Sequence, residues 1–257
     1  MNLGIKNQGV VVVGGAQGIG RAIAKAFAEE GCRVGVADLA PGGEFEHEEA
    51  VDVTDFSAIE KAAGNFAEKL GEVRHVVFAA GVGSGKFGFP FWNLDPADWN
   101  RVLDVNLRGA ANVAHAFAPT LTGNPDGTLL FLTSVAGQVG SQTDPPYSAA
   151  KAGLINFMQV VAKDFAPFRC RANCIAPGMV KTSLNESVWA AGQQLLAEEK
   201  RQTYESWADE KIKTIAPLGR WQEPEEFGAA AVFLASTLAR NITGQTINID
   251  GGQVMHS

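Results

Sequence analysis

The sequence has few of the residues that hold small secreted proteins together or bind metals. Its three cysteines are an odd number without a Cys-x-x-Cys pair. Cys170 and Cys174 lie in a strand-like segment, where a four-residue separation spans about 13 Å and is too long for a disulfide. The four histidines are scattered, at His47, His75, His115 and His256. The sequence therefore predicts neither a disulfide framework nor a metal site.

Long hydrophobic runs are also absent. The two longest stretches without a charged residue, Gly109–Pro125 and Gly127–Thr143, have 17 residues each and include proline, asparagine, glutamine or several glycines. They are too short and too polar to cross a bilayer. The N-terminal apolar run Val10–Val13 ends at Gly14, well short of the hydrophobic region of a signal peptide. We therefore expect a cytoplasmic protein that does not contact membranes.

Positive charge is scarce. The chain has 21 Lys and Arg residues against 28 Asp and Glu residues, which gives a net charge of −7, and its basic residues form no cluster. Proteins that follow the phosphates of nucleic acids or the surface of anionic membranes need such a cluster. The composition therefore excludes these partners and favours a small-molecule substrate.

What the sequence does contain is an alternation of short, β-branched apolar runs with segments of helical periodicity. This pattern predicts an α/β fold, a doubly wound parallel sheet of the Rossmann type with helices on both faces. We expect a single domain over residues 1–257, because no linker or repeat interrupts the pattern. The expected strands are Val10–Val13, Arg33–Ala37, a short one near Ala50–Val51, Val73–Ala79, Thr128–Thr133, Arg171–Ile175 and Thr246–Ile249.

A glycine-rich turn follows the first expected strand. Gly14, Gly18 and Gly20 stand between this strand and a helical segment, where small residues let the backbone approach a pyrophosphate at the positive end of a helix. No Gly-Lys-Ser/Thr ends the turn, so it is not a P-loop. An ordinary tight turn is the alternative for this motif considered alone.

An acidic residue completes the pattern of a dinucleotide site. Asp38 comes eighteen residues after Gly20, at the end of the second expected strand, where a carboxylate can accept hydrogen bonds from the adenosine ribose. Gln17 and Leu39 are uncharged at the natural positions for a base that would hold a 2′-phosphate. These residues favour NAD over NADP.

A second motif joins Ser134, Tyr147 and Lys151. Asp144 and Pro145 favour a helix start, with Asp144 as the N-cap, so Tyr147 falls in the first turn and Lys151 one turn later on the same face. A neighbouring ammonium and a helix N-terminus both favour the phenolate form of tyrosine, which lowers its pKa. The pair is therefore a candidate proton shuttle, and a buried tyrosine packed against a lysine stem is the alternative.

Together these motifs resemble the short-chain dehydrogenase/reductase family, from Val10 to Gly252. The resemblance extends to Asp52-Val53, to Asn106 in Asp-Val-Asn-Leu, and to Ser134 in Thr-Ser-Val-Ala-Gly. It also includes the segment from Pro177-Gly178 to Thr182 and the C-terminal Asn248-Ile-Asp250-Gly251-Gly252.

The resemblance implies hydride transfer between a nicotinamide and a carbinol or carbonyl carbon. It implies that Tyr147 is the acid/base, Ser134 polarises the substrate oxygen, Lys151 lowers the phenol pKa and binds the nicotinamide ribose, and Asn106 holds a water that joins Lys151 to solvent. The expected cofactor-binding residues are Gly14, Gln17, Gly18, Ile19, Gly20, Asp38, Leu39, Asp52, Val53, Ala80, Gly81, Tyr147, Lys151, Pro177, Gly178, Val180 and Thr182.

Two positions depart from the family pattern. The family usually has threonine at Val13, and Asn-Asn-Ala-Gly where this chain has Phe78-Ala79-Ala80-Gly81. Those polar groups tie the glycine turn to the fourth strand. Since both ends of that contact are apolar here, and a joint replacement can be nearly neutral, we expect an apolar contact between Val13 and Phe78 or Ala79.

Two segments are candidates for the substrate side. Gly81–Leu94 combines glycines with aromatic residues, and it is either a pocket edge or a packed loop. Residues 184–220 have apolar residues at roughly helical spacing and resemble the family's substrate-covering segment, which excludes water during hydride transfer. A helical pair that serves only packing or assembly is the alternative for this second segment.

We therefore expect an NAD-dependent oxidoreductase that acts on a secondary alcohol or ketone: a small alcohol, polyol, cyclic diol or hydroxy-ester. The alternative activity is reduction of a 3-oxoacyl thioester on an acyl carrier, and a non-catalytic cofactor sensor is disfavoured because the catalytic residues are retained. The family commonly assembles through the segments Ala110–Ala118 and Leu154–Phe165 and the last strand. We expect a homo-oligomer, either a tetramer or a dimer.

Overall fold

The computed structural model describes residues 2–255 and centres on a seven-stranded parallel sheet. The strand order is β3-β2-β1-β4-β5-β6-β7, and every neighbouring pair is parallel. The fold is thus the predicted doubly wound α/β sheet. The strands are β1 (Gly9–Val13), β2 (Arg33–Asp38), β3 (His47–Ala50), β4 (Val73–Phe78), β5 (Thr128–Leu132), β6 (Arg171–Pro177) and β7 (Thr246–Ile249).

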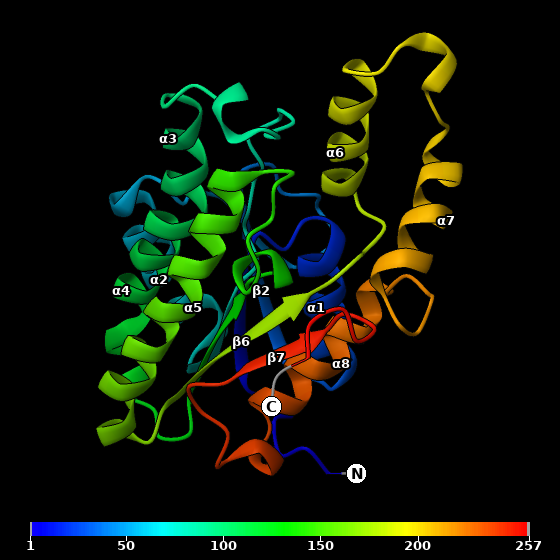
Figure 1. The fold of residues 1–257 in the computed structure, drawn as a ribbon. Helices are drawn as coiled ribbons and strands as arrows, with labels where there is room; N and C mark the ends of the chain where they lie inside the picture. Colours follow the sequence, from blue (N-terminus) through cyan, green and yellow to red (C-terminus); the bar gives the residue numbers. More distant parts are fainter. Residues whose placement is uncertain (1, 256–257) are drawn as a thin grey trace.

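Helices cover both faces of the sheet (Figure 1). One layer contains α2 (Phe56–Leu70), α4 (Gly109–Thr122) and α5 (Pro145–Phe165), and the other contains α1 (Gly18–Glu29) and α8 (Pro224–Ala235). The short α3 (Asp98–Leu103) leads through a wide helical turn at Asp104–Arg108 into α4. Each layer has its own apolar core against the sheet, so most central strands are buried on both faces and consist of apolar runs.

Val13, at a position where the chain departs from the family pattern, makes the expected apolar contact. Val13 of β1 lies opposite Phe78 of β4 in the sheet register, both side chains are buried, and they belong to the same core cluster. The backbone N–H of Ala79 donates to the Val13 carbonyl at 2.7 Å. The turn and the fourth strand are therefore joined by backbone bonds and apolar packing in place of polar side chains.

The third strand begins a few residues before its predicted position near Ala50–Val51. It covers His47–Ala50 and pairs with Gly35–Asp38 at the edge of the sheet. Its sequence, His-Glu-Glu-Ala, is polar and only partly buried, so hydrophobic patterning does not reveal it. The other strands agree with expectation within one or two residues at their ends. Cys170 and Cys174 are free thiols, as predicted.

The strand order of the sheet indicates which of its edges binds a ligand. Chain order reverses between the neighbours β1 and β4, and ligands of open parallel sheets bind at the carboxyl ends of strands at such a switch point. Gly14, Asp38, Ala79 and Ser134 come at or just after the carboxyl ends of β1, β2, β4 and β5. Residues far apart in sequence therefore meet at one edge.

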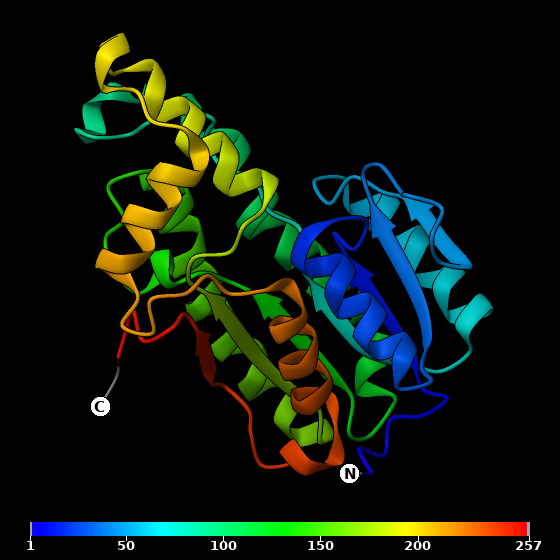
Figure 2. The same ribbon diagram turned by 90° about the vertical axis from the view of Figure 1, so that its right-hand side faces the viewer.

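The predicted covering segment forms a helical pair above this edge. It consists of α6 (Ser183–Gln194), a short 3-10 turn at Glu198–Lys200, and α7 (Tyr204–Ile215). Figure 2 shows α6 beside the loop that contains Phe91–Asn93, and the Phe87 ring lies close to Gly192 of α6. Ala208 and Ile212 of α7 pack in a small separate core with Met179. The pair is thus anchored to the loop after β6.

No helix within residues 2–255 is long and apolar enough to cross a membrane, and no group of three or more His, Cys, Asp and Glu side chains there is arranged to hold a metal ion. His256 lies outside the described residues.

Candidate active site

The glycine turn brings the backbone to a cavity. A Cβ on Gly20 would lie 2.0 Å from the Gly14 carbonyl oxygen, and one on Gly14 would lie 2.4 Å from the Ala80 nitrogen. Only glycine fits at these two positions. Gly18 has a φ of +55°, and a Cβ there would meet only the Thr182 side chain, at 3.9 Å. Its open side faces a cradle that a ligand can fill.

The start of α1 is suited to a diphosphate. The N-cap residue, Gln17, makes no side-chain capping bond, and the first turn contains no acidic residue. The backbone N–H groups and the positive end of the helix dipole therefore have no competing anion from the helix itself. This chemistry, together with the open side of Gly18, fits the diphosphate of a dinucleotide.

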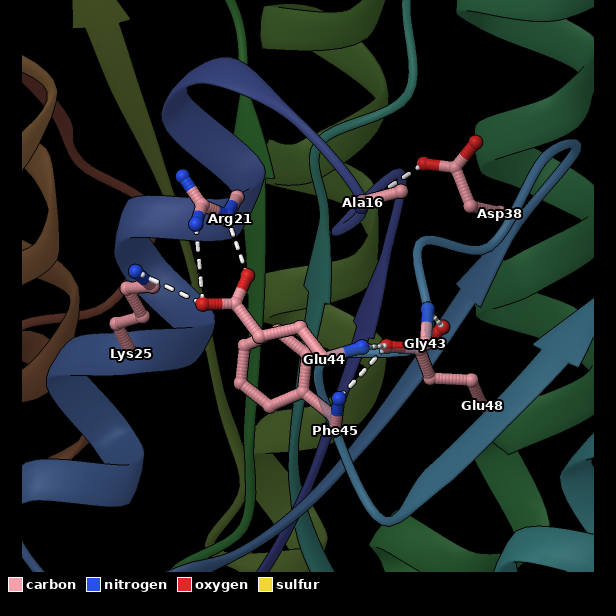
Figure 3. A network of polar contacts seen from close by, with 8 residues as sticks. All are labelled: Ala16, Arg21, Lys25, Asp38, Gly43, Glu44, Phe45 and Glu48. Carbon is pink, nitrogen blue, oxygen red and sulfur yellow. Dashed lines mark hydrogen bonds and ion pairs between the residues drawn. The ribbon is translucent and has the colours of Figure 1, made fainter.

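Asp38 lies beside this turn (Figure 3). Its Oδ2 accepts a hydrogen bond from the Ala16 N–H at 3.0 Å, and its Oδ1 accepts one from the Ala40 N–H at 3.3 Å. These bonds hold the carboxylate at the end of β2, against the glycine turn. Asp38 lines the first cavity at this position, and its expected contact with a ribose stays a prediction.

A cavity of about 590 Å³ extends from the glycine turn along the carboxyl edge of the sheet. It is lined by twelve of the seventeen predicted cofactor residues: Gly14, Gln17, Gly18, Ile19, Gly20, Asp38, Leu39, Asp52, Val53, Ala80, Gly81 and Thr182. The remaining five, Tyr147, Lys151, Pro177, Gly178 and Val180, line a second cavity of about 230 Å³. Ile19, Ala79, Gly81, Leu132 and Thr182 line both. The two cavities are therefore adjacent.

The second cavity contains three of the four predicted catalytic residues, Ser134, Tyr147 and Lys151. Ser134 follows β5, whereas Tyr147 and Lys151 lie in the first two turns of α5. The Ser134 hydroxyl accepts a hydrogen bond from the Ala136 N–H at 3.1 Å and is hydrogen-bonded to the Tyr147 hydroxyl. Lys151 is only 3% exposed, and its Nζ donates to the Leu132 carbonyl at 2.8 Å. Strand, turn and helix thus hold all three groups in place.

The expected lowering of the tyrosine pKa does not occur in the protein alone. Burial raises the pKa of Tyr147 to about 12, with the Ser134 hydroxyl acting in the opposite direction and the Asp144 carboxylate reinforcing the rise. Burial also lowers the pKa of Lys151 to about 8. The Lys151 Nζ lies 5.4 Å from the centroid of the Tyr147 ring and is bonded to Leu132. Desolvation therefore outweighs the ammonium, and the Tyr147 phenol is protonated at neutral pH.

Asn106 lies in the wide π-helical turn that precedes α4 and is fully buried. Its Nδ2 donates to the carbonyl oxygens of Val82 at 2.7 Å and Val102 at 2.9 Å, and its Oδ1 accepts from the Val82 N–H at 3.1 Å. Asn106 lines neither of the two cavities among the described residues. It fixes the loop after β4, and its expected role in holding a water stays a prediction.

Asp144 occupies the predicted N-cap position of α5, with Pro145 as the first helical residue, but it makes no side-chain capping bond there. Its Oδ2 instead accepts from the Ser84 N–H at 2.8 Å. Burial raises the pKa of this carboxyl. The predicted helix start is therefore confirmed, and the Asp144 side chain also ties the loop after Gly81 to the start of α5.

The sequence interpretation missed several lining residues. Arg101, Asp104 and Thr54 line the first cavity, and Asn185 and Lys211 line the second. They come from α3, α6, α7 and a loop, whose placement depends on tertiary packing. The one available signal was the spacing of Trp207 and Lys211, which puts both residues on one face of a helix.

Comparison with known proteins agrees with this geometry. Residues 14–254 match the family model described as enoyl-(acyl carrier protein) reductase. The chain is 35% identical over 254 residues to acetoacetyl-CoA reductase of Synechocystis sp., covering 98% of both proteins. It is 31% identical to the 3-oxoacyl-[acyl-carrier-protein] reductase FabG of Chlamydia muridarum, covering 98% of this chain and 99% of the relative.

A solved structure supports the same assignment. Aldohexose dehydrogenase of Thermoplasma acidophilum superposes with a TM-score of 0.87 at 25% identity, covering 99% of this chain and 97% of the other. This chain belongs to the short-chain dehydrogenase/reductase family. It is an oxidoreductase that uses a nicotinamide cofactor and acts on a CH–OH or keto group.

Proposed function

We propose that the protein is an NAD-dependent oxidoreductase that interconverts a free secondary alcohol and its ketone. The observation that carries this proposal is the small cavity lined by Ser134, Tyr147 and Lys151, adjacent to the cavity of the glycine turn. A nicotinamide bound there supplies or accepts the hydride. Ser134 polarises the substrate oxygen, and Tyr147 transfers the proton.

The surroundings of Asp38 support NAD as the cofactor. Asp38 lines the first cavity and offers negative charge, while Gln17 and Leu39 beside it are neutral. Figure 3 shows that Arg21 and Lys25 of α1 both pair with Glu44, with Lys25 Nζ at 2.8 Å from Oε1. The pairing lowers the pKa of Glu44 to about 2. These two cations are therefore engaged with a carboxylate and not free for a 2′-phosphate.

The loop that carries Glu44 is itself held in place. Glu48 accepts hydrogen bonds from the backbone N–H groups of Gly43, Glu44 and Phe45 at 2.7 to 2.8 Å (Figure 3). The cavity wall next to Asp38 is thus built without an unpaired base from this loop or from α1. A ribose with a free 2′-hydroxyl fits this wall better than one with a 2′-phosphate.

Replacing Asp38 is expected to change cofactor choice. The parent should use NAD with at least ~10-fold higher kcat/KM than NADP, since the carboxylate accepts ribose hydroxyls and repels phosphate. Asp38→Ala should lower kcat/KM with NAD by about 10-fold. It should also reduce the ratio of kcat/KM with NAD to kcat/KM with NADP. Initial rates with each cofactor measure both effects.

Asp38→Asn is the matched control for charge. This substitution keeps an oxygen that can accept a hydrogen bond from the Ala16 N–H and removes only the negative charge. It should therefore reduce the discrimination between NAD and NADP while retaining more activity with NAD than Asp38→Ala. Equal efficiency of the parent with NAD and NADP would refute the cofactor assignment.

The charges at the cavity mouth support a free substrate over a carrier-bound one. Acyl carriers are acidic, and they dock on basic surfaces. Of the three bases in the segments expected near the mouth, Lys86 pairs with Asp98 at 2.8 Å, Arg220 pairs with Glu226 at 2.7 Å, and Lys181 lies over the Trp221 ring. The net charge of the chain is −7. Encounter with an acidic partner is therefore slowed.

A second candidate is reduction of a 3-oxoacyl thioester. It is favoured by the names of the relatives that reduce acetoacetyl-CoA or 3-oxoacyl carriers. A panel of free secondary alcohols and ketones, run beside acetoacetyl-CoA and a carrier-bound 3-oxoacyl group, separates the two. Turnover of the thioesters together with inactivity on every free substrate would reverse the order of the candidates.

We also propose that the protein is cytoplasmic and a homo-oligomer, a tetramer or a dimer. A groove of about 440 Å³ runs between α4 and α5 and their preceding turn, with Leu107, Ala111, Phe157 and Val160 among its lining. Val160 is 47% exposed. Such an apolar face on a monomer is a liability that a second copy would bury.

Light scattering at micromolar concentration should therefore give a mass of two or four chains. Val160→Asp puts a charge in the groove and should shift the mass toward the monomer. Phe91→Asp is the matched control, because Phe91 is 67% exposed but lies on the loop beside α6. A parent that is monodisperse at the mass of one chain would contradict the assembly.

A further inference from the structure

The second cavity has a cation that the family resemblance does not account for. Lys211 of α7 lines it together with Ser134 and Tyr147. Its Nζ lies 4.3 Å from the centroid of the Trp207 ring, one turn earlier on the same helix. Ala208 and Ile212 on either side are buried in the core beneath α7. The helix is thus anchored in a rotation that turns Lys211 toward the catalytic residues.

No anionic partner of Lys211 is found among the described side chains. Within residues 2–255, the side chains of 183 and 184 apart, its Nζ makes no hydrogen bond or ion pair, in contrast to Lys86 and Arg220. Burial lowers the pKa of Lys211, and no neighbouring carboxylate offsets this effect. A half-buried ammonium that has lost water and gained no counter-ion is stabilised by any anion that enters the cavity.

The other charged groups of the cavity are already engaged. Lys151 donates to the Leu132 carbonyl and lies beside Tyr147 at the site of proton transfer. Asp144 accepts from the Ser84 N–H and forms no ion pair with Lys211 within the described part of the chain. Lys211 is therefore the cation of this cavity that is free to bind a substrate group away from the reacting carbon.

We propose that Lys211 binds an anionic group of the substrate, and that the substrate is a small hydroxy acid or the corresponding keto acid. This inference rests on the proposed function, since it places the reacting carbinol at Ser134 and Tyr147. The cavity of about 230 Å³ is smaller than typical drug-sized sites of about 300–1,000 Å³, which fits a compact molecule. A carboxylate a few bonds from the carbinol then spans from the sheet edge to α7.

Because Lys211 lies on α7, the helical pair also takes part in substrate recognition. Ser134 and Tyr147 belong to the rigid sheet edge and α5, whereas Lys211 belongs to α7. A substrate that carries both a carbinol and an anion contacts both parts at once. A neutral alcohol contacts only the first part and gains nothing from α7.

The test compares a hydroxy acid with its neutral ester. 3-Hydroxybutyrate and methyl 3-hydroxybutyrate have the same carbinol and differ in charge at the far end. We expect the parent to prefer the acid, and Lys211→Met to reduce the ratio of kcat/KM for acid over ester by about 10- to 100-fold, the usual effect of a lost charge-assisted bond. Methionine keeps an apolar stem over Trp207, and Lys211→Arg should restore part of the ratio.

Lys213→Met is the matched control, because Lys213 is exposed on the same helix and does not line the cavity. It should leave the ratio at the parental value. A phosphate monoester of a hydroxyalkane forms a third arm, and a Lys211-dependent preference for it would support the anion site with phosphate as the bound group.

Two negative results are distinguishable. If the parent oxidises the ester and the acid equally, and Lys211→Met leaves their ratio unchanged, the anion site is refuted while the proposed function stands. If the parent oxidises no free hydroxy acid, ester or alcohol, the proposed function fails, and the anion site fails with it.

Discussion

Tyr147→Phe is expected to lower kcat by about 10²- to 10⁴-fold, the usual contribution of general acid–base catalysis. The substitution keeps the ring and removes only the hydroxyl, which is the group bonded to Ser134. Burial holds the pKa of Tyr147 at about 12, so the residue carries its proton at neutral pH and can donate it to a ketone oxygen. The loss should therefore appear in the reduction of a ketone, measured by nicotinamide absorbance.

Cofactor binding separates this role from a structural one. The Tyr147→Phe variant should bind NAD with nearly parental affinity in a fluorescence titration, because the glycine turn and Asp38 are untouched. Ser134→Ala serves as a companion variant: it keeps the phenol and removes the hydroxyl that polarises the substrate. Parental turnover by Tyr147→Phe would exclude Tyr147 from the chemistry.

Lys151→Met should reduce kcat/KM by about 100-fold or more. It removes the ammonium that favours the phenolate in the oxidative direction, and it removes the group expected to bind the nicotinamide ribose. Both kcat and NAD affinity should fall, in contrast to Tyr147→Phe, where only kcat falls. Turnover at the parental rate with weaker NAD binding alone would restrict Lys151 to cofactor binding.

The pH dependence follows from the direction of the lysine shift. Burial lowers the pKa of Lys151 from 10.5 to about 8, so the ammonium is lost as pH rises through about 8, and alcohol oxidation should lose Lys151-dependent rate above that pH. Because the folded state disfavours the charged lysine, its burial costs stability below pH 8, and this cost is relieved between pH 8 and 10.5. Lys151→Met removes this cost and also removes the bond to the Leu132 carbonyl, two effects of opposite sign. The variant should therefore unfold within about 1 kcal/mol of the parent near neutral pH.

The sequence determined the fold class and most of the cofactor site. β-branched runs such as Val10–Val13 form strands buried on both faces, and the glycines after β1 mark the phosphate turn, because both patterns reflect local backbone and burial requirements. The spacing of Tyr147 and Lys151 within one helix is equally local. All seventeen predicted cofactor residues line the two adjacent cavities, although those outside the glycine turn, Asp38 and the Tyr147–Lys151 pair were expected only from the family resemblance.

Only the tertiary structure decided the electrostatics and the substrate side. Spacing suggests that Lys151 lowers the pKa of Tyr147, but burial of the phenol raises this pKa, and the Asp144 carboxylate adds to the rise. The edge strand His47–Ala50 has no apolar pattern because it is only partly buried. Lys211 reaches the catalytic cavity through the packing of α7 on the loop after β6. Burial and contacts between distant segments are properties of the folded chain, so no local pattern in the sequence encodes them.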